Sequence, residues 1–557
     1  MDFATLTHRN PHSLKIVGTR KIPDLSKKPA KMSKVNLDSL IPKDDFIAQT
    51  LTPAKKSKLT NLTLSHLLPN SDHNYASLAH LLRKPDFQRE TNEWDKRRIC
   101  DLIECFIKRD FIPSIILWES PDNNHIYVID GAHRISAILA YINDDYGDKD
   151  ISHKFYGYNK IPQAELDLAE ETREYINEKI GSFEMIMKEN GDLAAGIKNA
   201  AFDLQVIEGA VKRAEDSFFK INQQGVVLSP TEKALCKYRD RPSCIATRVI
   251  MRGIGGSQYW KNFEAKNQTG IKEIGEELNK LLFEPPYNDD SLSVILHHPL
   301  AGTITSATPM ILDFMKIIAA NHTKIKDVDD KTDGSEALLF LELARKIVWK
   351  ILSKAPGSLG LFPSVYFYSS GGKYIQSSFL GMIQLLLEND NNESFLPRFT
   401  KVRSKIENFL ITYKVYITQI NKKFGSKQRS YRHMKGFFVY LIDQFNTEIS
   451  ENDLLADIHK RYDYLNERES DIEKPKSKRF SKEQKIFLGN KEELLAQPKC
   501  KICTGILHPQ SKDYDHKQDL KHGGGSEDKN ARTTHYYCNN SKDLLIKLGI
   551  YKEPANV

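Results

Sequence analysis

The chain has 557 residues, of which 40% are hydrophobic and 28% are charged, and it carries a formal net charge of +8 at pH 7. Because a single hydrophobic core rarely grows beyond about 250–300 residues, this length predicts several domains of ordinary globular composition. No apolar run approaches the roughly 18–20 residues of a membrane helix, and seven cysteines are too few for a disulfide scaffold. The charge permits nucleic-acid binding without requiring it.

The first part of the chain, residues 1–60, is predicted to be a flexible basic arm. It is polar, its periodicity is weak, and the stretch "RKIPDLSKKPAKMSK" is basic and interrupted by prolines. Such a stretch is either a solvated arm or a contact with a phosphate backbone, and both interpretations stay open. The first residues lack the charged start and apolar stretch of a signal peptide, so we expect a cytoplasmic protein without a membrane partner.

Residues 61–240 alternate between helix and strand patterns, which predicts an α/β domain. Apolar residues at helical spacing predict the helices, and short runs of β-branched and aromatic residues predict the strands. The predicted helices cover residues 95–110, 133–143 and 210–222, and the predicted strands cover residues 113–120, 125–131 and 201–209.

This predicted domain contains a group of polar residues that could bind a ligand. The stretch "DFQRETNEW" places Gln88 and Arg89 before a helix, and "YVIDGAHR" places Asp130, Gly131 and Arg134 where a strand meets a helix. A glycine lets the backbone approach a ligand, a helix N-terminus offers N–H groups to a phosphate, and arginine adds a bidentate fork. Each signal is weak alone, because a DGxxR stretch is more often an ordinary turn, and a purely structural junction stays open.

Taken together and in order, these elements resemble the ParB-like N-terminal domain of the GmrSD-type restriction proteins, over about residues 75–240. That family has a QR…W element, a strand ending in DGQQR or a variant, and a later INxxGxxLS, which here reads "INQQGVVLS". The sequence departs from the pattern at Ala132 and His133, where the family usually has two glutamines. The resemblance implies a domain that senses target DNA and binds a nucleoside triphosphate such as GTP or ATP. The nucleotide-binding residues that it implies are Gln88, Arg89, Asp130, Gly131, His133 and Arg134.

Residues 241–465 are predicted to form a mostly helical middle domain, which we interpret as a spacer or lever arm. Its clearest helical patterns cover residues 334–352, 374–388, 398–417 and 434–445. A basic linker that ends with "KPKSKRFSKEQK" (residues 474–485) is predicted over residues 466–485, and a small module over residues 486–557. The predicted fold is therefore a multidomain α+β protein.

The last module carries two ligand pairs, Cys500 with Cys503 and His535 with Cys538, each separated by two residues. That spacing lets a tight knuckle or a first helical turn direct two donors at one ion. Three thiolates and one imidazole make a closed tetrahedral zinc set. Because so short a segment buries little core, a structural Zn²⁺ would supply much of its folding free energy.

Between the two ligand pairs, the stretch "DYDHKQDLKHGGG" contains Asp515 and His516, and Asn530 follows it. Asn539 comes directly after Cys538. In this order and spacing the residues resemble the HNH endonucleases of the ββα-metal fold, over about 45 residues. The sequence departs at two positions, with His535 where many members have cysteine and Asn539 where many have histidine.

The resemblance implies a DNA phosphodiester cleavage with His516 as general base and with Asp515 and Asn539 holding Mg²⁺ or Mn²⁺. Asn530 would tie down the loop and orient His516, and Lys542 would contact phosphate. A neutral imidazole suits the activation of water, and a divalent ion suits neutralisation of the phosphate and of the leaving oxygen.

These resemblances predict a restriction-type anti-phage endonuclease whose cutting is controlled by the N-terminal domain. An additional NTPase activity and assembly into a homo-oligomer are left open. Two rival hypotheses remain. One is a ParB-like DNA-binding regulator with a non-catalytic zinc knuckle, and the other is a non-specific nuclease toxin without nucleotide control.

Overall fold

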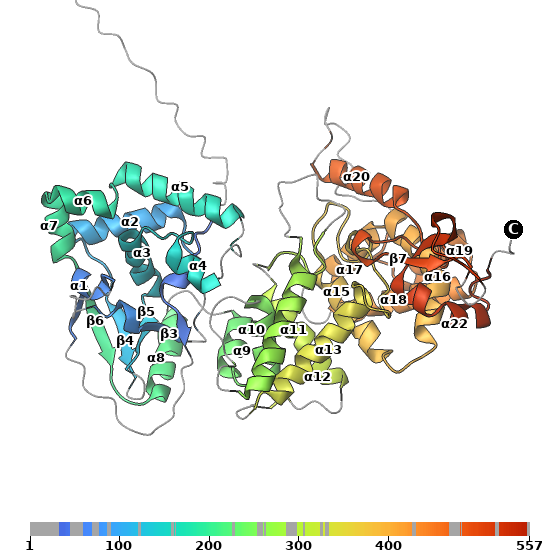
Figure 1. The fold of residues 1–557 in the computed structure, drawn as a ribbon, viewed down its shortest axis with the longest axis horizontal. Helices are drawn as coiled ribbons and strands as arrows, with labels where there is room; N and C mark the ends of the chain where they lie inside the picture. The colour runs from blue at the N-terminus through green and yellow to red at the C-terminus, as the bar shows by residue number, and fades with distance from the viewer. Residues whose placement is uncertain are drawn as a thin grey trace, which may run out of the picture.

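The chain forms two lobes, an N-terminal lobe built on a sheet and a larger helical lobe that carries the C-terminal module at its far end (Figure 1). The structure is a computed structural model. It describes residues 33–44, 59–69, 77–85, 88, 91–120, 124–156, 161, 163–224, 229–252, 260, 263–285, 298–304, 307–322, 327–328, 333–425, 430–466, 480, 482–518 and 523–553.

A six-stranded mixed sheet in the order β1-β3-β5-β4-β6-β2 forms the centre of the N-terminal lobe. β3 runs parallel to β1 and β5, β4 runs antiparallel to β5 and parallel to β6, and β2 closes the other edge antiparallel to β6. The strands are β1 (Lys43–Asp44), β2 (Asn61–Thr63), β3 (Leu82–Pro85), β4 (Ile115–Glu119), β5 (Ile126–Asp130) and β6 (Ala201–Ile207).

Side chains that alternate along β4 and β5 face two separate cores, as the period of a strand requires. Leu117 and Val128 pack into the core under the helical layer, whereas Trp118 and Tyr127 belong to a smaller cluster with Phe218 of α8. The helices of this lobe are α1 (Leu64–Leu67), α2 (Lys96–Lys108), α3 (Ala132–Asn143), α4 (Asp150–Tyr156), α5 (Gln163–Lys179), α6 (Phe183–Glu189), α7 (Asp192–Asn199) and α8 (Val211–Gln224). The helices and strands predicted between residues 95 and 222 are thus confirmed, with ends that differ by a few residues.

Residues 33–44 differ from the arm that the sequence predicts for this region. They form the 3-10 helix η1 (Asp38–Leu40) and the edge strand β1, and Val35 and Ile41 are buried in the core of the lobe. A buried ion pair between Asp38 and Lys84 of β3, at 2.5 Å, fixes the segment. The sequence did not predict this ordered segment, because the apolar residues Val35 and Ile41 stand among polar and basic neighbours without a regular period. The rest of the predicted arm, apart from residues 59–60, lies outside the described residues.

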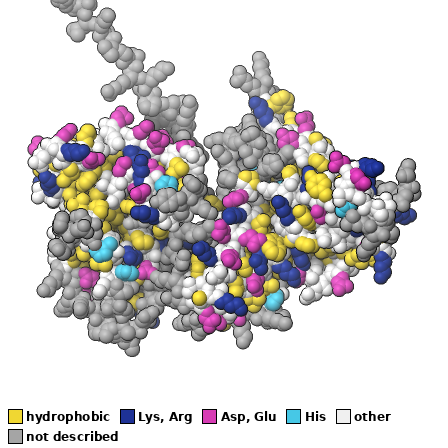
Figure 2. Space-filling view, viewed as in Figure 1, with side chains coloured by type: hydrophobic (Ala, Val, Ile, Leu, Met, Phe, Trp, Pro, Cys, Tyr) yellow, Lys and Arg dark blue, Asp and Glu magenta, His cyan; other side chains and the backbone are white. Residues whose placement is uncertain are grey.

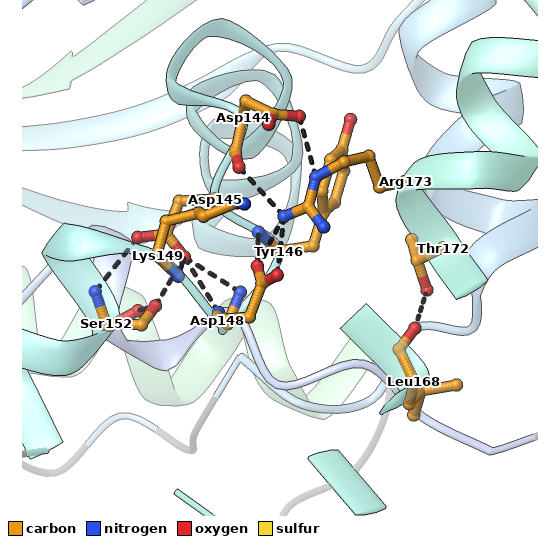
Figure 3. Close-up of polar contacts among 11 residues, drawn as sticks. Asp144, Asp145, Tyr146, Asp148, Lys149, Ser152, Leu168, Thr172 and Arg173 are labelled. Atoms are coloured by element: carbon orange, nitrogen blue, oxygen red, sulfur yellow. Dashed lines mark hydrogen bonds and ion pairs between the residues drawn. The ribbon is translucent and has the colours of Figure 1, made fainter. Parts of the chain in front are cut away.

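The turn after α3 is a dense polar cluster (Figure 3). Buried Asp145 accepts hydrogen bonds from the three backbone N–H groups of residues 147–149 and, at 2.7 Å, from the hydroxyl of Ser152. Arg173 of α5 donates two hydrogen bonds to Asp148, at 2.6 and 2.7 Å, and two to Asp144, at 3.0 Å to its carboxylate and 3.1 Å to its backbone carbonyl. These contacts anchor the C-terminal end of α3 and so hold the helix that begins at the β5 junction.

The second lobe is helical. Its helices are α9 (Pro230–Lys237), α10 (Pro242–Arg252), α11 (Ala265–Phe283), α12 (Thr308–Asn321), α13 (Ser335–Ile351), α14 (Pro363–Tyr366), α15 (Gln376–Glu388), α16 (Phe395–Thr412), α17 (Val415–Phe424), α18 (Ser430–Asn446), α19 (Glu451–Arg461) and α20 (Lys482–Ala496). The four helical patterns predicted here are confirmed, except that residues 398–417 divide between α16 and α17. No helix in the described parts of the chain is long and apolar enough to cross a bilayer.

Helix α9 connects the two lobes. Cys236 belongs to the small cluster of Trp118 and Phe218, and Arg239, just after α9, pairs with Glu215 of α8 at 2.7 Å. On its other side, the carbonyl of Leu235 accepts a hydrogen bond from Arg248 of α10 at 2.7 Å. The end of the N-terminal lobe is therefore packed onto the start of the helical lobe.

The C-terminal module shares the hydrophobic core of the helical lobe. Cys500, Ile506 and Tyr537 lie in the same buried cluster as the residues of α13, α15, α16 and α18. The sequence predicts a separate small module after a basic linker. The described residues instead show one continuous core. Of that linker, only residues 466, 480 and 482–485 are described.

Lys414, between α16 and α17, is buried in the helical lobe and donates to the carbonyl oxygens of Ser364 and Val365. Burial lowers the pKa of this lysine from 10.5 to about 7. Between these two pH values the unfolded chain binds the proton and the folded chain does not, so stability rises with pH there. We expect a slope of at most about 1.4 kcal/mol per pH unit, and a flatter profile in Lys414→Met.

Unfolding of the helical lobe measured at several pH values between 7 and 10 checks this expectation. Neighbouring His298 does not add to the slope, because burial lowers its pKa to about 4 and it stays neutral throughout the window. The control is Lys405→Met, which removes an exposed lysine of α16. Equal slopes for Lys414→Met and the wild type would contradict the assignment.

Candidate functional site

Four buried donors meet where the module joins the helical lobe: the thiols of Cys500, Cys503 and Cys538 and the imidazole of His535. Their ligand atoms all lie within 4.8 Å of one another. The His535 Nδ1 atom is 3.4 Å from the Cys503 sulfur and 3.8 Å from the Cys538 sulfur. Ligands bonded to zinc at about 2.0–2.3 Å in a tetrahedron stand roughly 3.3–3.8 Å apart, so the donors fit this ion.

The pKa values of two of the cysteines point the same way. Burial alone would raise the pKa of Cys500, but hydrogen bonds with Cys503, Cys538 and His535 hold that pKa well below its ordinary value. The pKa of Cys538 is raised well above its ordinary value, chiefly by its hydrogen bonds with Cys500 and Cys503. One thiolate surrounded by close donors is an arrangement that a single divalent cation satisfies. The buried cluster can therefore hold a metal such as zinc.

A contact beyond the four donors orients the histidine. The Nε2 atom of His535 lies 2.9 Å from the carbonyl oxygen of Ile506. When Nε2 donates its proton to that carbonyl, Nδ1 is left as the metal-facing donor. The N–H of Ile506 in turn donates to Glu407 of α16 at 2.6 Å.

Glu407 belongs to a buried ion pair that contacts the turn of residues 500–506, here called the knuckle, and so links it to the helical lobe. Arg403 and Glu407, one turn apart on α16, are each 1% exposed and lie 2.8 Å apart. Arg403 also donates to the carbonyl oxygens of Leu359, Gly360 and Ile506. Only glycine fits at position 505, because a Cβ there would lie 2.8 Å from the Arg403 side chain.

Two strands and a short helix follow the knuckle. β7 (Asp513–His516) pairs antiparallel with β8 (Ala531–Thr534), which leads through His535 into α21 (Tyr536–Asn540) and then α22 (Lys542–Lys547). The register places Asp513 opposite Thr534 and Asp515 opposite Arg532. Asp513 and Asp515 therefore share one face of the pair, and Tyr514 and His516 share the other.

The two acidic residues have different partners. Asn539 donates from Nδ2 to the Oδ2 atom of Asp513 at 2.8 Å. Asp515 is buried, and its carboxylate lies 2.6 Å from Arg532 and 3.3 Å from Lys542. The structure thus brings Asn539 to Asp513, whereas Asp515, the expected metal ligand, is paired with two cations.

Lys542 differs from its expected role as a phosphate contact. It is 7% exposed, and its ammonium lies 3.3 Å from Asp515 and 3.7 Å from Glu553. A lysine turned inward toward two carboxylates is poorly placed to meet a phosphate in solvent. The sequence did not predict this orientation of Lys542, because it depends on the contact of α22 with the β7–β8 pair.

Asn530 closes the loop between the two strands. Its Oδ1 atom accepts from the N–H of Gln518 at 2.8 Å, and its Nδ2 atom donates to the carbonyl oxygens of Gln518 and Gly525. The expectation that this side chain ties down the loop is consistent with these bonds. His516 lies just before the loop and is partly buried, and its imidazole forms no hydrogen bond with any described residue.

Sequence reasoning did not single out Asp513 or Arg532. The alternation along β7 could have pointed to Asp513, because residues two apart on a strand share a face. Arg532 carried no signal, since its pairing with Asp515 depends on the register of β7 and β8.

In the N-terminal lobe, the junction of β5 and α3 brings three predicted residues together. Arg134 pairs with Asp130 at 2.6 Å and donates to the carbonyl of Pro113 at 2.7 Å. Gly131 caps α3 with φ 99°, and a Cβ there would lie 3.0 Å from Ile115. The Asp130 side chain is 45% exposed and that of Arg134 is 13% exposed, so the carboxylate is the more accessible partner.

The remaining predicted residues of this lobe have separate surroundings. His133 stacks on Trp94, with ring centroids 5.5 Å apart. The guanidinium of Arg98 also lies over the Trp94 ring, 4.6 Å from its centroid. The Oε1 atom of Gln88 is buried and has no hydrogen-bond partner within the described ranges. Arg89 lies outside the described residues.

The comparisons with known proteins bear on this lobe. Residues 64–239 match the family model described as "GmrSD restriction endonuclease, N-terminal domain". The match supports a GmrSD-type restriction N-terminus, as the motifs predict, and it ends before the C-terminal module. No curated protein and no solved structure matches the chain.

The four-donor cluster predicts that the purified chain contains one zinc ion and that Cys538→Ser loses it. Because the cluster shares the core of the helical lobe, the loss should lower the melting temperature of that lobe by roughly 6–12 °C if about 3 kcal/mol is lost. Elemental analysis and calorimetry measure the two effects.

The control is Cys105→Ser, which alters a thiol of α2 far from the cluster in the chain and should keep the zinc. A zinc-free wild type with an unchanged melting temperature in Cys538→Ser would contradict the metal site.

Proposed function

We propose that the chain is a metal-dependent DNA endonuclease of restriction-type defence, in which the C-terminal module cuts and the N-terminal domain controls the cutting. The GmrSD-type match over residues 64–239 supports the restriction context and DNA as the substrate. The observation that carries the proposal is the Cys3His cluster framing two strands and a helix, with His516 on the first strand and Asn539 on the helix.

His516 is the proposed general base. An imidazole changes protonation near neutral pH, so its neutral form can take a proton from water. Its partly buried ring forms no hydrogen bond with a described residue, so both ring nitrogens are available to a ligand. Asn530, through its three hydrogen bonds across the loop ends, holds the backbone directly after this histidine.

On the opposite face, Asp513, Asp515 and Asn539 offer oxygen donors for a hard cation, and these fit Mg²⁺ or Mn²⁺. A bound divalent ion would neutralise charge on the phosphate and on the leaving oxygen. The expected holders are Asp515 and Asn539. The 2.8 Å contact of Asn539 adds Asp513 to this set, while Asp515 balances the charges of Arg532 and Lys542.

For the N-terminal domain we propose a nucleoside triphosphate site at the start of α3. The exposed carboxylate of Asp130 would position a metal or water, and Arg134 and the first N–H groups of α3 would face the phosphates. The buried, unpartnered Oε1 of Gln88 supports a polar ligand in this lobe. The proposal covers nucleotide binding alone, since Ala132 and His133 stand where the GmrSD-type pattern has two glutamines.

The deciding experiment is a cleavage assay on plasmid and phage DNA, modified and unmodified, with Mg²⁺ or Mn²⁺ and with or without nucleotide. His516→Ala should lower cutting by roughly 10²–10⁴-fold, because it removes the general base. Ser526→Ala, a change in the exposed loop of the same module, is the control and should cut normally.

Equal cutting by His516→Ala and the wild type would reject the catalytic module. DNA binding without any cutting would favour the regulatory rival. Cutting that ignores both nucleotide and DNA modification would favour the toxin rival.

Substitution of the two aspartates separates metal binding from folding. Asp513→Asn should lower cutting and raise the Mn²⁺ concentration needed, with little change in melting temperature, because Asp513 is only partly buried. Asp515→Asn should also destabilise the module, by about 3–5 kcal/mol, because it breaks a buried ion pair. Metal titrations and thermal unfolding of both variants measure this.

An unchanged metal requirement in Asp513→Asn would remove that residue from the site. A full loss of cutting in Asp515→Asn at unchanged stability would assign the metal to Asp515 alone.

A further inference from the structure

A cavity of about 660 Å³ lies beside the β7–β8 pair, outside the four-donor cluster. Its lining joins the two strands to the knuckle and to the chain after α22, and consists of Lys501, Tyr514, Lys517, Ala531, Arg532, Thr533, Tyr551 and Lys552. Volumes of about 300–1,000 Å³ are typical of pockets that hold ligands. Figure 2 shows Lys and Arg side chains at the end of the molecule that the C-terminal module forms.

The cavity carries net positive charge. Lys501, Lys517 and Lys552 are exposed, and none of the three forms an ion pair with a described residue. The fourth cation, Arg532, is the register partner of Asp515 on the face away from Tyr514, and Asp515 neutralises it. Three uncompensated ammonium groups around one cavity match the spaced negative charges of a nucleic-acid backbone.

An aromatic surface accompanies these charges. Tyr514 is 60% exposed although it lies in the middle of a strand, and its partner across the pair is Thr533, which also lines the cavity. The ammonium of Lys512 lies 5.3 Å from the Tyr514 ring. An exposed ring flanked by cations is the combination with which proteins hold nucleic-acid strands, since bases stack on the ring while lysines meet phosphates.

The position of the cavity connects it with cutting. His516 follows Tyr514 by two residues on β7, so both belong to the same face, and Ala531, the partner of His516, lines the cavity. A strand held along Tyr514 would therefore lead toward the His516 imidazole.

We propose that this cavity binds the DNA strand that carries the scissile phosphate, with Lys501, Lys517 and Lys552 on its phosphates and a base against Tyr514. The part of this proposal that places the scissile phosphate here rests on the proposed function. The part that assigns DNA binding to the cavity rests on its lysines and on Tyr514.

The test measures binding of a labelled single-stranded oligonucleotide by anisotropy, across a range of salt concentrations, with the full chain carrying His516→Ala. Adding Lys501→Ala, Lys517→Ala and Lys552→Ala should reduce the slope of log K against log salt by about 2, since each lost contact is worth about 0.7. Adding Tyr514→Ala should weaken binding by about tenfold and leave the slope unchanged, whereas Tyr514→Phe should bind normally.

The matched control replaces three exposed lysines outside the cavity, Lys401, Lys405 and Lys547, with alanine. All variants should keep the parent melting temperature, because the changed side chains are exposed. If the cavity variants bind with the parent affinity and slope, or if the control loses as much as they do, the cavity is not the DNA site.

Failure of the proposed function is seen separately. Wild-type protein that never cuts, but whose DNA binding depends on the cavity residues, would reject the nuclease and keep the cavity. Normal cutting together with unaffected binding in the cavity variants would reject the cavity and keep the nuclease.

Discussion

The buried ion pair of Arg403 and Glu407 is the contact on which the C-terminal half of the structure depends. Each side chain is 1% exposed, so the cost of burying two charges must be offset by complete pairing. Arg403 meets carbonyl oxygens of both the helical lobe and the knuckle, and Glu407 accepts from Ile506 of the knuckle. Docking of the knuckle adds the Ile506 carbonyl as a partner of Arg403 and the Ile506 N–H as a partner of Glu407, so the buried pair links the knuckle to the helical lobe.

This constraint extends from the helical lobe to the proposed catalytic residues. Ile506 contacts Glu407 through its N–H and His535 through its carbonyl, and His535 begins the helix that carries Asn539. At the other end of the lobe, α9 contacts both α8 and α10. A continuous series of packed elements thus joins the N-terminal domain to the C-terminal hairpin. A sensing domain could act on a nuclease through such a series only if some element in it has two arrangements.

The two faces of the β7–β8 pair separate two kinds of chemistry. Asp513, Asp515 and Arg532 lie on the face near α21, where carboxylates, an amide and two cations neutralise one another. Tyr514 and His516 lie on the other face, where lysines surround the cavity without acidic partners among the described residues. The alternation of a strand produces this division from adjacent residues. One short stretch thus presents carboxylates on one face and an aromatic ring with an imidazole on the other.

The sequence by itself determined what local spacing encodes: the strands and helices of the N-terminal domain, the two ligand pairs of the metal cluster, and the GmrSD-type motifs that the family match supports. Periodicity and ligand spacing act over a few residues, so they are visible without a fold. Only the tertiary structure decided that residues 33–44 complete the sheet, that the C-terminal module shares the helical core, that Lys542 turns inward, and that Asn539 meets Asp513. Each of these depends on partners far away in the chain or on strand register, and burial of a charge or an apolar side chain is a property of those partners rather than of its neighbours in sequence.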